Sequence, residues 1–230
     1  KENNFKKKLE NKILSFKPDI VIHAATLFTK TNNLDVKKKC LKINYHYSKI
    51  LLNIVIANKI KKFIYFGSNY EFEKNKKKIY PYLKSKQKFS KYLCKINSYN
   101  TKLLVFYLFN TFGENDKRNK LYSKIIKNPK KKIFFKLKLK LNYINIKSLT
   151  NYIKLQLLRN WNFKKRFISV ANKKYFTVKD LKMLKINFLP DTHSTNLVLE
   201  HKLIIPLKKK YFYPNKDNSL YEFIKKKIYK

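Results

Sequence analysis

Residues 62–68 read Lys-Phe-Ile-Tyr-Phe-Gly-Ser, a short apolar run that ends at a glycine and a serine. Runs of this kind indicate a buried strand, and two similar runs occupy residues 19–25 and 103–109. Between the runs, apolar residues recur at helical spacing over residues 34–58, and Pro81 opens a second helix that extends to about residue 96. This alternation predicts an α/β sheet with parallel crossovers, which holds its ligands at the carboxyl ends of the strands.

The second half of the chain has a less regular pattern. Its spacing predicts helices over residues 118–127, 148–158, 178–184 and 220–228, and strands over residues 133–135 and 166–170. No low-complexity linker separates the two halves, so we expect the second half to form a lobe built onto the same sheet.

The charge balance of the 230 residues is strongly basic, with 56 Lys+Arg, 13 Asp+Glu and a formal net charge of +43. The chain is also 44% hydrophobic, which is enough for a core and argues against a disordered basic tail. The lysines are spread along the whole chain, and arginine, which a dedicated nucleic-acid binder uses for bidentate contacts, is scarce. We therefore interpret the charge mainly as solvated surface, which disfavours nucleic acid as a partner.

Cysteine and hydrophobicity patterns exclude several further classes of protein. The two cysteines, Cys40 and Cys94, form no cluster with ligand spacing, so we expect neither a disulfide framework nor a metal site. No apolar run reaches the roughly 18 residues of a membrane span, and the first residues do not resemble a signal peptide. The composition predicts a cytoplasmic protein without a membrane partner.

Polar residues gather where the predicted strands end. Residues 23–25 end the first strand, Ser68 follows the second, and Tyr82 and Lys86 lie near the start of the next helix. Side chains four residues apart share one helix face, and an ammonium beside a phenol lowers the pKa of the phenol. Tyr82 is then a candidate proton donor or acceptor near neutral pH, with Ser68 holding a carbonyl or hydroxyl of the substrate. The spacing alone is weak, because 17 tyrosines and 53 lysines produce it by chance.

The context strengthens this interpretation. The order of residues 18–25, Asn44, residues 63–68 and residues 80–86 resembles the extended short-chain dehydrogenase/reductase family, which includes NAD-dependent epimerases and dehydratases. Asn110-Thr-Phe-Gly113 looks like the substrate-facing segment of that family. Within the family, residues 113–121 look most like the CDP-paratose and CDP-abequose synthase branch, whose members are 4-keto reductases of deoxysugar nucleotides.

The resemblance implies a Rossmann-like parallel sheet with flanking helices. Residues 1–110 would form a partial dinucleotide-binding region that carries the catalytic residues, and residues 111–230 a small substrate-binding lobe. The implied cofactor is NAD or NADP, the implied substrate is a nucleotide-diphosphate sugar, and the implied assembly is a homodimer. The reaction would be oxidation, reduction or epimerisation at a sugar carbon, with tyrosine as acid and base.

The resemblance also implies roles residue by residue. The catalytic residues would be Ser68, Tyr82, Lys86 and Asn44. The cofactor would contact His23, Ala24 and Ala25 together with Tyr82 and Lys86. The sugar nucleotide would contact Ser68, Asn110, Lys117 and Arg118.

One expected feature of the family is missing from the sequence. The family holds the cofactor pyrophosphate on a Gly-x-x-Gly-x-x-Gly turn, whereas the only glycines here are Gly67 and Gly113. We therefore expect the chain to lack the first half of its dinucleotide site. Two alternatives stay open: a non-catalytic Rossmann-like remnant that binds a partner or a nucleotide, and a basic nucleic-acid-binding protein.

Overall fold

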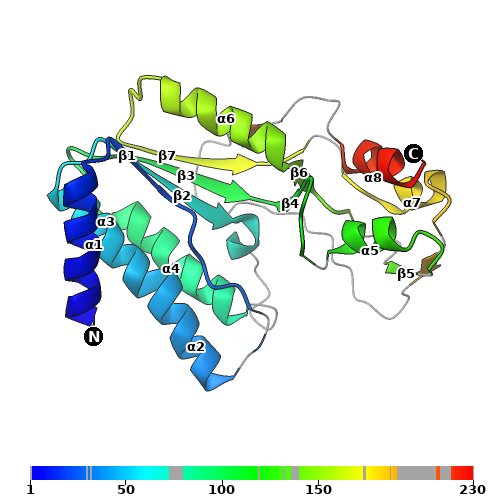
Figure 1. The fold of residues 1–230 in the computed structure, drawn as a ribbon, viewed down its shortest axis with the longest axis horizontal. Coiled ribbons are helices and arrows are strands. Elements are labelled where there is room, and N and C mark those ends of the chain that lie inside the picture. Colours follow the sequence, from blue (N-terminus) through cyan, green and yellow to red (C-terminus); the bar gives the residue numbers. More distant parts are fainter. Residues whose placement is uncertain are drawn as a thin grey trace. The chain divides into compact units, whose positions relative to one another are not determined.

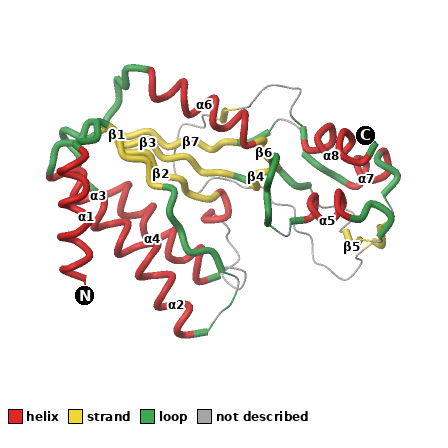
Figure 2. The backbone as a smooth tube through the Cα atoms, in the orientation of Figure 1, coloured by secondary structure: helices red, strands yellow, loops and turns green. Residues whose placement is uncertain are grey.

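A computed structural model describes residues 2–29, 31, 33–72, 80–118, 120–131, 133–135, 140–172, 175–186, 188–190, 211–212 and 219–229. The chain divides into two compact units. The first comprises Lys1–Tyr107, Asn160–Ser169 and Leu203–Lys209, and the second comprises Leu108–Arg159, Val170–Lys202 and Lys210–Lys230. Figures 1 and 2 show the helices and strands of both units.

The first unit is built on a sheet in which the strands lie in the order β1-β2-β3-β7. The strands are β1 (Ile20–His23), β2 (Lys62–Ser68), β3 (Lys102–Leu108) and β7 (Lys165–Val170). The helices are α1 (Glu2–Phe16), α2 (Leu34–Leu41), η1 (Lys42–Tyr47), α3 (Ser48–Ala57), η2 (Asn69–Phe72) and α4 (Pro81–Lys95). Helices α1 to α4 lie on one face of the sheet (Figure 1), which confirms the predicted α/β class.

The register of the sheet sets where β1 and β2 end, and with them His23 and Ser68. Strands β1 and β2 are parallel, with Ile20 opposite Lys62 and His23 opposite Tyr65. The first strand is shorter than predicted, because it ends at His23 and leaves Ala24 and Ala25 in the loop that follows. The carboxyl ends of β1 and β2 therefore lie side by side, as a parallel sheet requires.

The helix predicted over residues 34–58 is not continuous. It divides into α2, a π-helical turn (η1) and α3. Asn44 is buried in the π-helical turn, whose wider winding is often found at functional sites. The apolar spacing predicted helix throughout, but it contained no signal for the change of winding.

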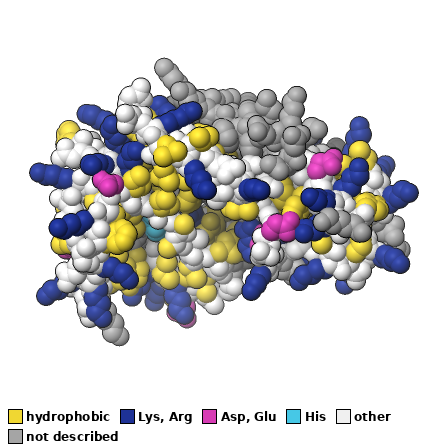
Figure 3. Space-filling model, turned by 45° about the horizontal axis from the view of Figure 1, so that its top comes forward, with side chains coloured by type: hydrophobic (Ala, Val, Ile, Leu, Met, Phe, Trp, Pro, Cys, Tyr) yellow, Lys and Arg dark blue, Asp and Glu magenta, His cyan; other side chains and the backbone are white. Residues whose placement is uncertain are grey.

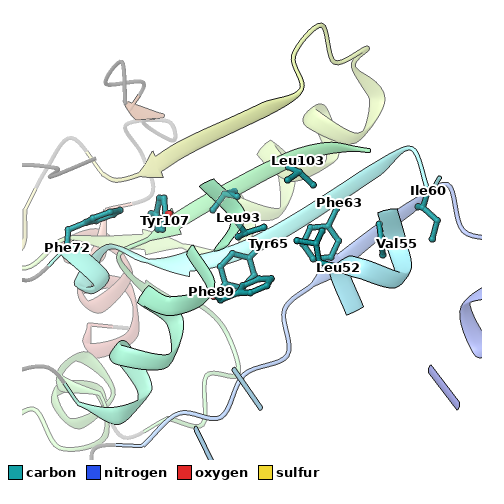
Figure 4. Packing of buried hydrophobic residues seen from close by; sticks show 11 residues of the cluster. Leu52, Val55, Ile60, Phe63, Tyr65, Phe72, Phe89, Leu93, Leu103 and Tyr107 are labelled. Atoms are coloured by element: carbon teal, nitrogen blue, oxygen red, sulfur yellow. The ribbon is translucent and has the colours of Figure 1, made fainter. Parts of the chain in front are cut away.

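The core of the first unit packs α3 and α4 against β2 and β3 (Figure 4). Phe63 and Tyr65 from β2 belong to the same buried cluster as Phe89 from α4, and the rings of Tyr65 and Phe89 meet edge to face at 4.8 Å. Burying one such side chain stabilises a fold by about 1.5–3 kcal/mol. This packing fixes α4, and with it Tyr82 and Lys86, against the end of β2.

The second unit contains short parallel pairs of strands. Strand β4 (Asn110–Phe112) pairs with β6 (Tyr143–Asn145), and β5 (Ile133–Phe135) pairs with β8 (Phe188–Pro190). The unit also contains β9 (Tyr211–Phe212) and helices α5 (Leu121–Lys127), α6 (Ile146–Leu158), α7 (Val178–Met183) and α8 (Leu220–Ile228). The strand at 133–135 and the helix at 220–228 are confirmed with the predicted ends, and the other three helices are confirmed with shifted ends, but β4, β6, β8 and β9 were not predicted.

Lysine and arginine side chains are scattered over the visible face in Figure 3 and do not gather into one stripe there. This distribution agrees with the interpretation of the charge as solvated surface. Within the described parts of the chain, no helix combines the length and hydrophobicity that crossing a bilayer requires.

Candidate active site

Asn44 joins the loop after β1 to the start of α4. Its Oδ1 accepts hydrogen bonds from the backbone N–H of Leu27 at 2.7 Å and from the hydroxyl of Thr26 at 3.1 Å. Its Nδ2 donates to the carbonyl of Leu27 at 2.9 Å and to Ser85 Oγ at 3.0 Å. Ser85 Oγ in turn donates to the carbonyl of Tyr82 at 2.7 Å. The buried amide thus positions both the loop and the tyrosine-bearing turn of α4.

Helix α4 places Tyr82 and Lys86 one turn apart, after Pro81 at its first position. Lys86 is buried, and its Nζ donates to the carbonyl of Phe66 at 2.7 Å. The same Nζ lies 5.7 Å from the centre of the Tyr82 ring, a cation–π distance. Phe28, from the loop after β1, meets the Tyr82 ring edge to face at 5.1 Å. The predicted pairing of Tyr82 with Lys86 on one helix face is present.

Ser68 ends β2 and is held by a residue that sequence reasoning missed. Its backbone N–H donates to Glu71 Oε1 at 2.6 Å, and its Oγ accepts from the N–H of Tyr70 at 3.3 Å. Glu71 is buried in η2, and Ser90 Oγ donates to its Oε2 at 2.5 Å. Only its position three residues after Ser68 could have drawn attention to it.

The electrostatics of Tyr82 differ from the expectation. Burial, and then the negative charge of Glu71, raise the pKa of the Tyr82 phenol well above its ordinary value. Burial also lowers the pKa of the Lys86 ammonium to about 8, against the opposing effect of Glu71. The predicted lowering of the Tyr82 pKa by Lys86 was therefore wrong for the protein alone. The reason is that burial and a carboxylate outweigh one ammonium.

The end of β1 carries the residues predicted to face a cofactor. His23 is buried, and its Nε2 shares a hydrogen bond of 2.7 Å with Ser48 Oγ. Burial, and to a lesser extent the charge of Lys86, lower the pKa of His23 to about 4, so the ring is neutral at pH 7. Ala24 and Ala25 are exposed just beyond the strand. Two small exposed residues at a strand end leave room for a flat ligand to approach the backbone.

Three of the four predicted substrate contacts, Asn110, Lys117 and Arg118, lie in the second unit, and the fourth, Ser68, lies in the first. Asn110 begins β4 and is half-buried, while Lys117 is exposed. The guanidinium of Arg118 donates to Asp116 Oδ1 at 2.7 Å and Oδ2 at 2.5 Å, and to Thr111 Oγ1 at 2.9 Å. Arg118 thus already has intramolecular partners, so phosphate binding by this residue stays a prediction.

The residues present fit one end of a dinucleotide better than the other. At the end where the resemblance predicts the nicotinamide, the Lys86 ammonium has N–H donors beyond the one that meets Phe66, and Ala24 and Ala25 are exposed. At the pyrophosphate end, neither glycine offers a phosphate turn. A Cβ at Gly67 would lie 2.6 Å from the Tyr107 ring, and one at Gly113 would lie 2.3 Å from Ile146 Cγ2. Both glycines therefore serve packing.

Comparison with known proteins agrees with this geometry. The family model described as "NAD dependent epimerase/dehydratase family" matches residues 5–144, and the chain belongs to that family. A search of curated proteins found no sequence that matches the chain.

Solved structures with the same fold include several epimerases. UDP-glucose 4-epimerase of Thermotoga maritima, solved with UDP-glucose, matches with a TM-score of 0.69 and 16% identity over 97% of this chain and 80% of that one. UDP-N-acetylglucosamine 4-epimerase of Methanobrevibacter ruminantium, in complex with UDP-N-acetylmuramic acid, matches with a TM-score of 0.66 and 19% identity over 94% and 78%. UDP-glucuronic acid 4-epimerase of Bacillus cereus, in complex with NAD, matches with a TM-score of 0.65 and 17% identity over 79% of this chain and 65% of that one. At these identities the likeness shows the fold alone.

Proposed function

We propose that the chain is an NAD(P)-dependent enzyme that oxidises, reduces or epimerises a nucleotide-diphosphate sugar. The observation that carries the proposal is the Tyr82–Lys86 pair at the carboxyl end of β2, with Lys86 buried and fixed on the carbonyl of Phe66. Family membership supports the reaction class, and NAD or nucleotide sugars bound in the structural neighbours support the ligands.

The bound cofactor would exchange a hydride with the sugar carbon. Tyr82 would give its phenolic proton to the sugar oxygen as the carbonyl is reduced, and it would take the proton back in the reverse direction. The raised pKa of Tyr82 keeps the phenol protonated at neutral pH, which suits the donor role. Lys86 would stabilise the resulting phenolate, Ser68 would orient the sugar oxygen, and Asn44 would hold the tyrosine-bearing turn. The reductase direction, as in the 4-keto-deoxysugar branch, is the finer form of the proposal.

The remaining site assignments belong to the same proposal. His23, Ala24 and Ala25 would line the cofactor, and residues 111–230 would supply the substrate-binding lobe. Asn110, directly before that lobe, and Lys117 and Arg118 within it would contact the sugar nucleotide.

Tyr82→Phe tests the proposal directly. We expect the variant to lose about 10²–10⁴-fold in turnover, because general acid–base catalysis contributes that much, while cofactor binding changes little. The measurement is oxidation of NADH or NADPH by the full protein with keto-sugar nucleotides, combined with calorimetric titration of each cofactor.

The matched control is Tyr99→Phe, which removes the hydroxyl of a tyrosine that is 77% exposed. Unchanged turnover in Tyr82→Phe would refute the assignment of Tyr82. A wild-type protein that binds a sugar nucleotide but uses neither cofactor would favour the non-catalytic binding protein instead.

A further inference from the structure

The proposed function uses Lys86 but gives no role to the buried acid beside it. Among the residues that the structure describes, Glu71 is the buried carboxylate and Lys86 the buried ammonium, with exposed fractions of 5% and 3%. A carboxylate is costly to bury unless hydrogen bonds and an opposite charge compensate it. Its presence behind the Tyr82–Lys86 pair therefore needs a physical reason.

The contacts of Glu71 connect the end of β2 to α4. Its Oε1 accepts from the backbone N–H of Ser68, and its Oε2 accepts from the hydroxyl of Ser90 on α4. Its own carbonyl accepts from Gln87 Nε2 at 2.5 Å. Both carboxylate oxygens thus have donors within the protein, and the residue acts on the site through its neighbours.

The backbone before Ser68 makes room for this carboxylate. A Cβ at Gly67 would lie 3.0 Å from Glu71 Oε1, closer than most real Cβ contacts, and 2.6 Å from the ring of Tyr107. A side chain at residue 67 would therefore displace the groups that surround Glu71. Because Gly67 has no side chain, the carboxylate of Glu71 fits beside the end of β2.

The groups around Glu71 leave Lys86 as its electrostatic partner. Burial raises the pKa of Glu71, while Lys86 and the hydrogen bonds from Ser90 and Ser68 oppose that rise. Within the described part of the chain, the other titratable groups that interact with the carboxylate are the phenols of Tyr65, Tyr82 and Tyr107. The phenols are neutral at pH 7, so among these groups the ammonium is the charge that compensates the carboxylate.

We propose that Glu71 is a positioning residue for the Tyr82–Lys86 pair. Its carboxylate fixes the backbone that carries Ser68, and its negative charge keeps the buried Lys86 ammonium protonated. The inference rests on the proposed function, because Lys86 has a chemical role only there. Glu71 is not the proton donor or acceptor itself, since its two oxygens already accept hydrogen bonds away from solvent.

The first test is Glu71→Gln, which keeps the shape of the side chain and removes its charge. We expect the pKa of Lys86 and the pKa of Tyr82 both to fall, because Glu71 raises each of them. NMR titration of protein labelled with ¹³C at lysine Cε and tyrosine Cζ measures both groups without substrate. The loss of each signal in Lys86→Arg or Tyr82→Phe assigns it. Unchanged titration of Lys86 in Glu71→Gln overturns the proposal.

The second test is the pH dependence of turnover. In Glu71→Gln we expect kcat to fall on the alkaline side and to recover at lower pH, with KM little changed. Above its pKa the charged fraction of Lys86 falls about tenfold for each pH unit. A lower pKa of Lys86 therefore moves the alkaline side of the kcat profile to lower pH. An equal loss at every pH would mean a merely structural role and would overturn the proposal. If the wild-type protein has no turnover, the proposed function fails while the NMR titration still decides the role of Glu71.

Two further variants keep the tests decisive. Glu222→Gln makes the same change at an exposed glutamate on α8, and it should leave both titrations unchanged. If Glu71→Gln does not fold, the double variant Glu71→Gln/Lys86→Met, which removes both charges, should fold. Failure of the double variant as well would show that charge compensation is not the role of Glu71.

Discussion

Two pairs of opposite charges, one in each unit, occupy contrasting environments. Glu71 and Lys86 are both buried in the first unit, whereas in the second unit the Arg118 side chain is 52% exposed and Asp116 10% exposed. Arg118 meets Asp116 directly through two nitrogens, and Tyr122 also donates to that carboxylate. Glu71 and Lys86 instead form hydrogen bonds with backbone groups and with a serine hydroxyl.

From the difference we expect that the geometry of an ion pair does not by itself decide its contribution to stability. Water solvates Arg118 when its partner is lost, so a good bidentate contact contributes little to stability. Water cannot replace a lost partner of Glu71 or Lys86, so removing either charge leaves the other buried without compensation and destabilises the fold. We therefore expect the Glu71–Lys86 pair, whose hydrogen bonds go to other groups, to contribute more to the stability of the fold and to the site than the Arg118–Asp116 pair.

The largest effect is expected for Lys86→Met, which leaves the Glu71 carboxylate buried without its partner. The free energy of unfolding should fall by about 3 kcal/mol at pH 7, as measured by urea denaturation. Glu71→Gln/Lys86→Met should recover most of that loss. The pKa of Glu71 is raised in the folded protein, so the folded state binds the extra proton. The loss in Lys86→Met should therefore shrink as the pH falls toward the ordinary range of a glutamate.

The control is Lys84→Met, at an exposed position on the same helix. It should change the free energy of unfolding by less than about 0.5 kcal/mol. Equal stabilities for Lys86→Met and Lys84→Met would contradict the expectation that burial gives the Glu71–Lys86 pair its weight.

A matched pair of hydroxyl deletions sharpens the comparison. Ser90→Ala removes the donor to buried Glu71 Oε2, and Tyr122→Phe removes the donor to Asp116 Oδ2. We expect Ser90→Ala to lower the free energy of unfolding by about 1–3 kcal/mol, because a buried acceptor loses its partner. Tyr122→Phe should lower it by less than about 1 kcal/mol, because Arg118 still contacts the same carboxylate oxygen. Thermal and urea denaturation at pH 7 measure both, and the reverse order would contradict the expectation.

The sequence was sufficient for the framework of the first unit. Strand β2 was predicted because its apolar run is short and ends at Gly67, and α4 because Pro81 can only begin a helix there. The spacing of Tyr82 and Lys86 then placed both on one face, since helical periodicity fixes which side chains are neighbours. Each of these inferences depends on local geometry alone.

The missed features depend on contacts between distant segments. Glu71 lies in a single turn, η2, and whether its side chain faces water or the core depends on Gly67, Ser90 and Tyr107. The direction of the Tyr82 pKa was wrong for the same reason, since a carboxylate eleven positions earlier in the chain sets it together with burial. Strands as short as β4 and β6 contain too few residues to show a period of two.

The smallest effect is expected for Arg118→Ala. Because the guanidinium is about half exposed, its loss should lower the free energy of unfolding by no more than about 1 kcal/mol at low salt, and less in 0.5 M salt, an ionic strength of about three times the physiological value. Hydrogen bonds from Arg118, the largest cause, hold the pKa of Asp116 well below its ordinary value. The stability that this provides is therefore present above the ordinary aspartate pKa and is lost as the pH falls through the lowered one.

Urea denaturation of Arg118→Ala across the acid range measures this contribution, with Lys117→Ala, its exposed neighbour, as the control. The variant should lose less stability than the wild type as the pH falls below about 4, because its Asp116 has a more ordinary pKa. Lys117→Ala should follow the wild type. A loss for Arg118→Ala as large as that for Lys86→Met would mean that exposure does not decide the energetic weight of a charge pair in this protein.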